Sequence, residues 1–515
     1  MQEPLQDYSK IGYLYRKTAK NFYMNIVEIS AEFAPIIKVG GLADVVHGLS
    51  MELVKRGQDV TVILPFFPWI KKKIPHVRNT KKTIVTCEKN QWHNNSIWEV
   101  IQDQVHLIFI EDHHPDRYFS RENIYGYQDD IARFLYFSKV AMDFLLNEKK
   151  TIDVLHLHDW HTAICPILYK DILQSHNMTV KKIAFTVHNF QHQGKCSQQN
   201  LRNIGLDAKK YLNKELLQDE SSDDLELLNL LKGAIVYSDV VTTVSKSYAQ
   251  EVVQKEGAFG LEKVVKDNKG KLFGIVNGLD YEEWNPEKDT HLKGHFSPRN
   301  TEKELHEAKL VNKQNLQSEL GLAPDSMKPM FISIGRLVWQ KGPELIKEAI
   351  SYIINSGGQF VLCGSSPEKD TQKKFDELKK MYNSNKNIHF HFDYNEPLAR
   401  KMFAGADFII IPSKFEPCGL TQLIAMRYAT IPIVRKTGGL ADTVFDVDDK
   451  NVPEKARNGY VFEKDDASEL FESLKRAFND FKNNKTKHIA YKNLELDHSW
   501  TEPAKEYLAL FALKN

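Results

Sequence analysis

Short apolar runs alternate with amphipathic segments along most of the chain. After Met24 the run N-I-V-E-I-S predicts a buried strand, and D-V-T-V-I-L-P from Asp59 predicts another. Between them, the segment after Gly41 predicts a helix, because its apolar residues repeat on one face; these are Leu42, Val45, Val46, Leu49 and Leu53. A strand, a helix and a second strand form the βαβ unit from which parallel sheets are built.

The same alternation continues through both halves of the chain. In the N-terminal half, further strands are predicted at residues 105–110, 152–158, 183–188 and 240–244. In the C-terminal half they are predicted at residues 330–335, 360–364, 388–392, 408–412 and 431–434, with helical patterns between them. Both halves are therefore of the α/β class.

A polar, turn-rich stretch from Asp267 to about Lys328 separates the two halves. The 515 residues also exceed what one ordinary core accommodates, which indicates two large domains. We predict one domain at residues 24–270, a second at 271–490, and a helical tail at 491–515. Residues 1–23 are polar and basic, and we expect them to be a disordered extension.

Composition narrows the choice of partners. Lys plus Arg number 69 against 68 for Asp plus Glu, so no overall charge attracts nucleic acid or an anionic membrane. No apolar stretch approaches the roughly 20 residues that span a bilayer. The five cysteines are scattered and form no C-x-x-C pair, which argues against a disulfide framework or zinc ribbon and favours a cytoplasmic protein.

Nearly the same nine residues occur twice, as K-V-G-G-L-A-D-V-V from Lys38 and as K-T-G-G-L-A-D-T-V from Lys436. Each copy follows an apolar run and opens a helix, so each predicts a strand, a tight glycine loop and a helix N-terminus. Paired glycines let backbone amides approach a ligand, and the helix dipole favours an anion such as phosphate there. Either copy alone is also compatible with an ordinary turn.

In the C-terminal half, charged side chains follow two of the predicted strands. In G-R-L-V-W-Q-K-G-P, Arg336 and Lys341 follow a strand, and a guanidinium with a flexible ammonium suits a diphosphate. In P-S-K-F-E-P-C-G-L-T, Glu416 lies at a bend before a helix that begins near Gly419. Solvated surface charges and helix capping are the alternatives.

Histidines end two strands of the N-terminal half. The segment V-L-H-L-H-D-W-H-T places His156, His158, Asp159 and His161 around one strand end. The segment T-V-H-N brings His188 and Asn189 to the next strand end. An H-x-H pair is compatible with a metal site, although the sequence shows no matching second set of ligands. A lone histidine at a strand end also has a structural interpretation.

These segments together resemble the bacterial glycogen synthase and plant starch synthase family. The resemblance runs from Met24 almost to the C-terminus, and ordered motifs in both halves carry it. They are K-V-G-G-L, Y-G-Y-Q-D-D-I-A-R-F, H-D-W-H-T, V-H-N-F, T-T-V-S, N-G-L-D-Y-E-E-W-N-P, G-R-L-V-W-Q-K-G, E-P-C-G-L-T and T-G-G-L-A-D.

The resemblance implies the glycosyltransferase B fold, with two Rossmann-like domains facing across a deep cleft. It implies that Lys38, His188, Arg336, Lys341 and Glu416 are the catalytic residues. The substrate-binding residues that it implies are Gly40, Gly41, Asp44, Asp159, Asn189, Asn277, Cys418, Gly419, Leu420 and Thr421.

The family's reaction transfers glucose from ADP-glucose or UDP-glucose to an α-1,4-glucan such as glycogen, with retention of configuration. It needs no metal or other cofactor, so Arg336 and Lys341 are expected to balance the charge of the departing diphosphate. The sequence does not decide between the two donors and fixes no oligomeric state.

Three other interpretations remain at this point. One is a synthase of the same fold that uses a small acceptor, of the sucrose-phosphate or trehalose-phosphate type. Another is a catalytically silent glucan-binding relative. The third is a metal hydrolase built on His156 and His158, which a chelator would inactivate.

Overall fold

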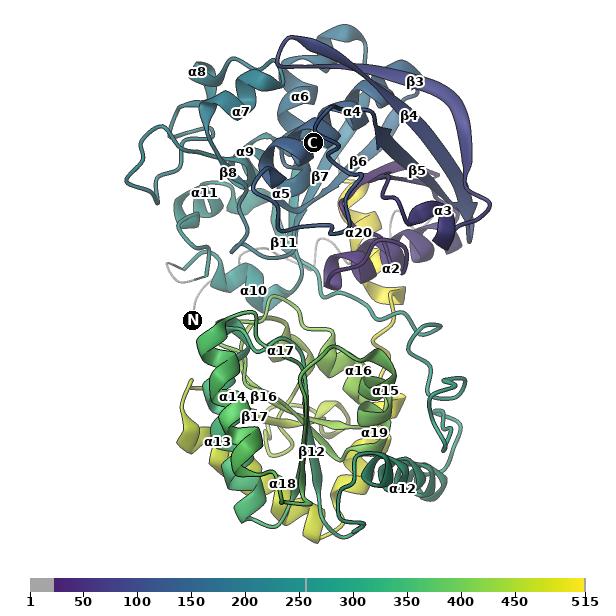
Figure 1. Ribbon diagram of the computed structural model, residues 1–515, viewed down its shortest axis with the longest axis vertical. Helices are drawn as coiled ribbons and strands as arrows, with labels where there is room; N and C mark the ends of the chain where they lie inside the picture. The colour runs from purple at the N-terminus through teal and green to yellow at the C-terminus, as the bar shows by residue number, and fades with distance from the viewer. Residues whose placement is uncertain (1–22, 255–256, 514–515) are drawn as a thin grey trace. The chain divides into compact units, whose positions relative to one another are not determined.

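A computed structural model describes residues 23–254 and 257–513 (Figure 1). The chain divides into two compact units. The first comprises the described residues up to Gly278 together with those from Trp500 onward, and the second is Leu279–Ser499. The predicted extension at residues 1–23 lies outside the described residues except for Tyr23.

The boundaries differ from the expected residues 270 and 490 for identifiable reasons. Strand β11 (Leu272–Gly274) pairs with β10 (Val240–Thr243), so the first unit's sheet continues past residue 270. Helix α19 (Thr486–Glu495) contributes Leu494 to the core of the second unit, so that unit continues past residue 490. The described residues from Trp500 onward, which include helix α20 (Thr501–Phe511), return to the first unit.

Among the described residues, the first unit holds a nine-stranded sheet in the order β11-β10-β7-β6-β1-β2-β5-β4-β3. From β11 to β5 the strands are parallel, and β5, β4 and β3 pair antiparallel. A short β8–β9 pair lies apart. The bounds of the remaining strands are β1 Asn25–Ile29, β2 Asp59–Pro65, β3 Arg78–Glu88, β4 Gln91–Gln102, β5 Val105–Asp112, β6 Ile152–His158, β7 Val180–Val187, β8 Lys195–Cys196 and β9 Leu228–Asn229.

Helices α2 and α20 pack together against this sheet, and the α20 side chains Tyr507 and Phe511 contact the His156 ring. The helices of the unit besides α20 are α2 Gly41–Lys55, α3 Ile70–Lys73, α4 Asp130–Glu148, α5 Asp159–Thr162, α6 Cys165–Asp171, α7 Gln198–Asn203, α8 Ala208–Tyr211, α9 Leu230–Tyr237, α10 Lys246–Glu251 and α11 Glu262–Asp267, with 3-10 turns at Leu173–His176 and Lys269–Lys271.

Residues 279–499, all of which the structure describes, form a six-stranded parallel sheet in the order β14-β13-β12-β15-β16-β17. Its inward residues are continuous apolar runs, such as Phe408–Ile411 in β15, because both faces of a parallel sheet are covered. The strands are β12 Met330–Ile334, β13 Gln359–Cys363, β14 Ile388–His391, β15 Phe408–Ile411, β16 Ile431–Arg435 and β17 Tyr460–Phe462.

Helices cover both faces of this second sheet (Figure 1). One apolar core lies under α12, α15, α16 and α19, and the other under α13, α14 and α18. The helices besides α19 are α12 Glu302–Glu319, α13 Pro343–Asn355, α14 Lys369–Met381, α15 Glu396–Gly405, α16 Thr421–Arg427, α17 Gly438–Thr443 and α18 Ala467–Lys482, with 3-10 turns at Trp339–Lys341 and Glu454–Ala456.

Within the described ranges, no helix has the length and apolar character needed to cross a membrane.

A substitution at Gly48 of helix α2 tests how the C-terminal segment that begins at Trp500 packs against this helix. A Cβ at this position would lie 1.9 Å from the indole nitrogen of Trp500, a side chain that is itself buried. We expect Gly48→Ala to lower the free energy of unfolding by about 1–3 kcal/mol, because the core has no room for the methyl group. Denaturant unfolding measures the loss.

Gly270→Ala is the matched control, since a Cβ there meets no atom within 4 Å. Equal stability of the two variants would contradict the packing assigned to Trp500.

Candidate active site

The strand order of each sheet reverses at one point. Across the sheet, the parallel strands of the first unit read β5-β2-β1-β6-β7-β10-β11, and those of the second read β14-β13-β12-β15-β16-β17. Both are the doubly wound order in which the fourth strand joins the opposite side of the first. Ligands of such sheets bind at the carboxyl ends of the strands beside this reversal, which lies between β1 and β6 and between β12 and β15.

Predicted site residues follow the strands at each reversal. Lys38 follows β1, and Asp159 comes directly after β6. In the second unit, Arg336 follows β12 and Glu416 follows β15. The topology therefore brings the residues of each unit to the edge where a ligand is expected.

The first lysine–glycine loop precedes helix α2, which begins at Gly41 with Gly40 as its N-terminal cap. Lys38 Nζ lies 2.7 Å from Asp44 in the first turn of that helix. The backbone amides of Val39 and Gly40 both donate to Glu32 Oε2, at 2.6 and 3.1 Å. A carboxylate of the protein thus accepts from the amides of Val39 and Gly40, and the anion site expected at this helix N-terminus stays a prediction.

Glu32 is a buried residue that the sequence interpretation missed. Its Oε1 accepts from the Tyr125 hydroxyl at 2.8 Å, while Oε2 holds the loop. Burial raises the pKa of Glu32, and the two amides and the Tyr125 hydroxyl oppose this rise. The available signal was an acidic residue between the first strand and the lysine loop. Glu32 fixes the loop that carries Lys38.

Asp159 and His188 meet at the ends of neighbouring strands β6 and β7. Asp159 has a left-handed backbone, with φ of 56°, and its Oδ1 accepts the His188 backbone N–H at 2.7 Å. Burial raises the pKa of Asp159 to about 7, against the backbone donors of His188 and Asn189. Burial lowers the pKa of His188 to about 3, so its imidazole is neutral at physiological pH.

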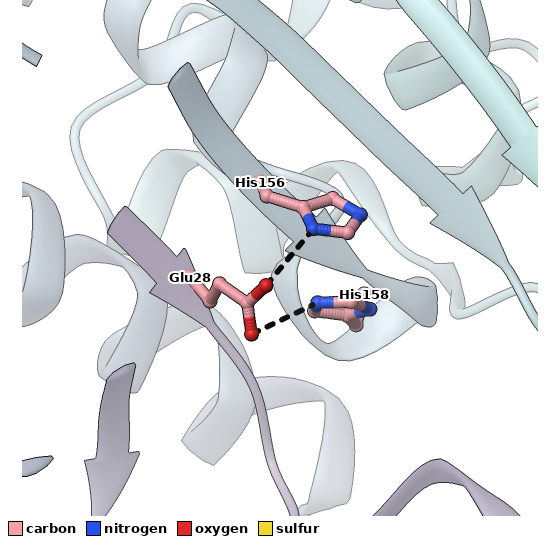
Figure 2. A group of neighbouring side chains, drawn as sticks. All are labelled: Glu28, His156 and His158. Atoms are coloured by element: carbon pink, nitrogen blue, oxygen red, sulfur yellow. Dashed lines mark hydrogen bonds and ion pairs between the residues drawn. The ribbon is translucent and has the colours of Figure 1, made fainter. Parts of the chain in front are cut away.

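Behind His188 lies a cluster of Glu28 from β1 with His156 and His158 from β6 (Figure 2). All three side chains are fully buried. Glu28 Oε1 lies 3.3 Å from His156 Nδ1, and His158 Nδ1 lies 3.1 Å from His188 Nε2. A hydrolytic metal needs a coordination position open to water. Complete burial therefore disfavours the hydrolase interpretation of this pair.

In the second unit, Lys341 and Glu416 form an ion pair. Lys341 Nζ lies 2.6 Å from Glu416 Oε2, which also accepts from Ser413 Oγ at 2.8 Å. Pro343 begins α13 as the sequence predicts. Arg336 is exposed, and no hydrogen bond or ion pair joins it to any residue in the described ranges. This edge thus carries a guanidinium and an ammonium held in place by a carboxylate.

The second glycine loop serves the Glu416 turn. Gly439 N donates to Glu416 O at 2.9 Å. A Cβ at Gly438 would lie 2.0 Å from Glu416 O, and one at Gly439 would lie 2.0 Å from Cys418 O. Both glycines are therefore required by backbone packing, and the anion site expected at this copy stays a prediction.

Of the remaining predicted residues, some lie at the start of helix α16, and Asn277 lies apart from them in sequence. Leu420 caps α16, which begins at Thr421, and Gly419 adopts φ of +74°, which favours glycine. Asn277 is buried, and its Oδ1 has no hydrogen-bond partner in the described part of the chain. No hydrogen bond or ion pair between described residues connects Asn277 to those at the strand reversal.

Comparison with known proteins covers nearly the whole chain. Residues 25–267 match the family described as starch synthase catalytic domain, and residues 319–494 match glycosyl transferases group 1. A glycogen synthase of Protochlamydia amoebophila is 41% identical over 95% of this chain and 99% of its own length. A probable starch synthase 4 of Arabidopsis thaliana is 40% identical over 94% of this chain, which spans 46% of that protein. The chain belongs to the glycogen and starch synthase family.

Solved structures agree with this membership. The catalytic domain of starch synthase IV from Arabidopsis thaliana, bound to ADP and acarbose, has a TM-score of 0.90 and 40% identity, covering 95% of this chain and 99% of that one. The family resemblance and the glycosyltransferase B fold class are thereby confirmed.

A sucrose-phosphate synthase from Thermosynechococcus elongatus has a TM-score of 0.55 and 17% identity over 93% of this chain and 96% of its own. At that identity the likeness shows the fold alone. Synthases with small acceptors therefore share the architecture of the glycogen and starch synthase family, and this likeness gives their activity no further support here.

The raised pKa of Asp159 predicts a pH-dependent stability. The folded carboxyl keeps its proton up to about pH 7, whereas the unfolded one releases it near pH ~4, so the folded state binds the extra proton between these values. The free energy of unfolding then falls as the pH rises through this window. Asp159→Asn, which cannot ionise, should lose less stability than the wild type between about pH 5 and about pH 8.

Unfolding midpoints measured across this range check the prediction. Parallel profiles for the two proteins would show that Asp159 titrates normally.

Proposed function

We propose that this protein is a glycogen (starch) synthase, which transfers glucose from ADP-glucose, with UDP-glucose as the alternative donor, to the non-reducing end of an α-1,4-glucan. The observation that carries this proposal is the 0.90 TM-score and 40% identity to a starch synthase catalytic domain whose structure holds ADP and acarbose. Identity of 41% to a bacterial glycogen synthase over 99% of its length supports the same activity.

In this proposal the cations act on the donor diphosphate. Arg336 presents an exposed guanidinium, and the ion pair with Glu416 orients the Lys341 ammonium. Lys38, on the loop that Glu32 holds, contacts the sugar nucleotide, together with Gly40, Gly41 and Asp44. Two positive charges, of which the Lys341 ammonium is held by Glu416, stabilise the departing diphosphate in place of a metal ion, so the reaction requires no cofactor.

The transferred sugar is neutral and needs hydrogen bonds more than charges. His188 is uncharged, and Asp159 holds its backbone. We assign the contacts to glucose to His188 and Glu416, with support from Asp159, Asn189 and Asn277. Cys418, Gly419, Leu420 and Thr421 line the sugar and phosphate pocket. The acceptor hydroxyl attacks the anomeric carbon from the face of the leaving group, and a phosphate oxygen of that group takes its proton, which retains the configuration.

We further propose that the protein acts in the cytoplasm. Support comes from its five cysteines, each within the described residues, which are all free thiols.

Incorporation of labelled glucose into glycogen tests the proposed activity. The wild type is assayed with ADP-glucose and UDP-glucose in parallel, with EDTA present, and we expect polymer growth that survives chelation and is faster with ADP-glucose. Lys38→Ala should abolish most of it. Lys170→Ala is the matched control, since its ammonium has similar exposure (35% against 33%) and also pairs with one aspartate.

Failure of both donors, with folded protein that still binds glycogen, would refute the transferase and favour the silent glucan-binding relative. Activity lost on chelation and restored by a divalent metal would refute the metal-free assignment.

The roles assigned to Arg336 and Lys341, which together we call the diphosphate clamp, lead to a separate prediction. Arg336→Ala and Lys341→Ala should each lower kcat by about 100-fold or more, because each removes a charge aimed at the leaving group. Lys374→Ala, which breaks an exposed pair with Glu344 in the same unit, should leave kcat unchanged. Steady-state kinetics with ADP-glucose measures all three. A clamp variant that raised KM alone would place its cation in ground-state binding instead.

A further inference from the structure

A stripe of polar side chains crosses the interior of the first sheet. It joins four adjacent parallel strands through Glu28 of β1, His156 and His158 of β6, Thr186 of β7 and Thr242 of β10. Each of these side chains is completely buried. The interior of a parallel sheet is normally apolar, and burying polar groups is costly unless they hydrogen-bond to one another. The arrangement of their protons therefore matters.

One branch of the stripe ends within the sheet. A carboxyl oxygen facing an imidazole nitrogen accepts, so the 3.3 Å contact of Glu28 Oε1 places a proton on His156 Nδ1. His156 Nε2 then accepts from the Thr186 hydroxyl at 2.7 Å, and Thr186 lies 2.6 Å from the Thr242 hydroxyl. Both ring nitrogens of His156 thus have hydrogen-bond partners, and this branch does not lead to the candidate site residues.

The other branch leads to the candidate active site. Figure 2 shows that His158 also points toward Glu28. His158 Nε2 lies 4.0 Å from Glu28 Oε2 and has no hydrogen-bond partner among the residues that the structure describes. Its other nitrogen, Nδ1, lies 3.1 Å from His188 Nε2. The carboxyl group of Glu28 is thus connected to His188 through one imidazole.

The protons of this branch follow from the neutrality of both rings. Burial lowers the pKa of His158 and of His188, so each ring carries a single proton. On His158 a proton at Nε2 faces the Glu28 oxygen attractively, whereas a lone pair there would be repelled. His158 Nδ1 must then accept, so His188 Nε2 must donate, and His188 Nδ1 is left with a lone pair.

We propose that Glu28 is a positioning residue that acts through His158 to hold His188 in one tautomer, with the proton on Nε2 and an acceptor at Nδ1. That His188 Nδ1 accepts from a hydroxyl of the transferred glucose rests on the proposed function. The His188 backbone is held by Asp159 and its ring by His158, so the acceptor has a fixed direction.

A metal ion in the same cluster would have the opposite effect. A cation bound by Glu28 and His158 Nε2 would force the His158 proton onto Nδ1. His188 Nε2 would then become the acceptor and Nδ1 the donor. The tautomer of His188 therefore distinguishes the two possibilities directly.

The decisive experiment is nitrogen NMR of the full chain labelled with ¹⁵N-histidine, because protonated and unprotonated ring nitrogens resonate far apart. Loss of signals in His188→Ala assigns the residue. We expect a protonated Nε2 in the wild type. A protonated Nδ1, or a stoichiometric metal found by elemental analysis of the purified protein, would overturn the proposal. Once His188→Ala has assigned the signals, the wild-type spectrum decides this, whatever the behaviour of the other variants.

Glu28→Gln tests the causal step. With its amide oxygen opposite His156, its NH₂ group replaces the Oε2 oxygen that accepts from Ser50 Oγ at 2.8 Å and lies 4.0 Å from His158 Nε2. An NH₂ group at this place favours a lone pair on His158 Nε2, which should reverse both tautomers. Thr242→Val, a change of similar size in the branch that ends in the sheet, should leave the His188 signals unchanged. An unaltered His188 tautomer in folded Glu28→Gln would refute the connection.

Kinetics tests the part that depends on function. Loss of one hydrogen bond to a neutral group predicts a kcat about three- to tenfold lower in Glu28→Gln, with the KM for glycogen unchanged. In a His188→Ala background, the same substitution should have no further effect, whereas a merely structural defect would lower both rates equally. If the wild type transfers no glucose, the proposed function is refuted. The NMR measurement still determines which tautomer His188 adopts, so the two failures are distinguishable.

Discussion

The candidate site residues of each unit depend on one constraint, the reversal of strand order in its parallel sheet. On either side of the reversal, the connections leave toward opposite faces of the sheet, so the two carboxyl ends are not covered by a crossover helix. Lys38 and Asp159 flank this point in the first unit, and Arg336 and Glu416 flank it in the second. The reactive groups are distant in sequence, and only the strand order makes them neighbours within each unit.

Burial then gives the two edges different chemistry. In the first unit it keeps His188 neutral and raises the pKa of Asp159, so that this edge offers hydrogen bonds with little charge. In the second unit Arg336 is exposed, and Lys341 forms an ion pair with Glu416. Groups that hydrogen-bond without net charge suit the first edge, and an anion such as a diphosphate suits the second.

The sequence predicted the elements whose patterns are local. The strand at residues 152–158 and the start of α13 at Pro343 follow from an apolar run and from the fixed φ of proline. The antiparallel β3–β4 hairpin was not predicted, because many residues of β3, such as Lys81 and Lys82, are polar and exposed. An extended segment with solvent on one face lacks the continuous apolar run that marked the parallel strands.

Site residues were predictable where a motif carried them and were missed where only tertiary contacts reveal them. Glu28 is a single polar residue in the run N-I-V-E-I-S, and its contacts with His156 exist because β1 pairs with β6. Glu32 acts through amides of a loop that folds back on it. The contact between His158 and His188 was foreseeable from adjacent strand ends, but which nitrogens face each other depends on side-chain orientation that no pattern encodes.

The repeated lysine–glycine motif shows that local sequence alone does not set a chemical role. Around Gly40 a Cβ would meet no atom within 4 Å, whereas Gly438 has Glu416 O at 2.0 Å from that position. The lysines differ as well, since Lys38 pairs with Asp44 of its own motif and Lys436 pairs with Glu463 beyond β17. Gly40 of the first copy therefore borders open space, and the second copy uses its glycines to support the Glu416 turn. Identical residues acquire these different roles because different backbone lies against them.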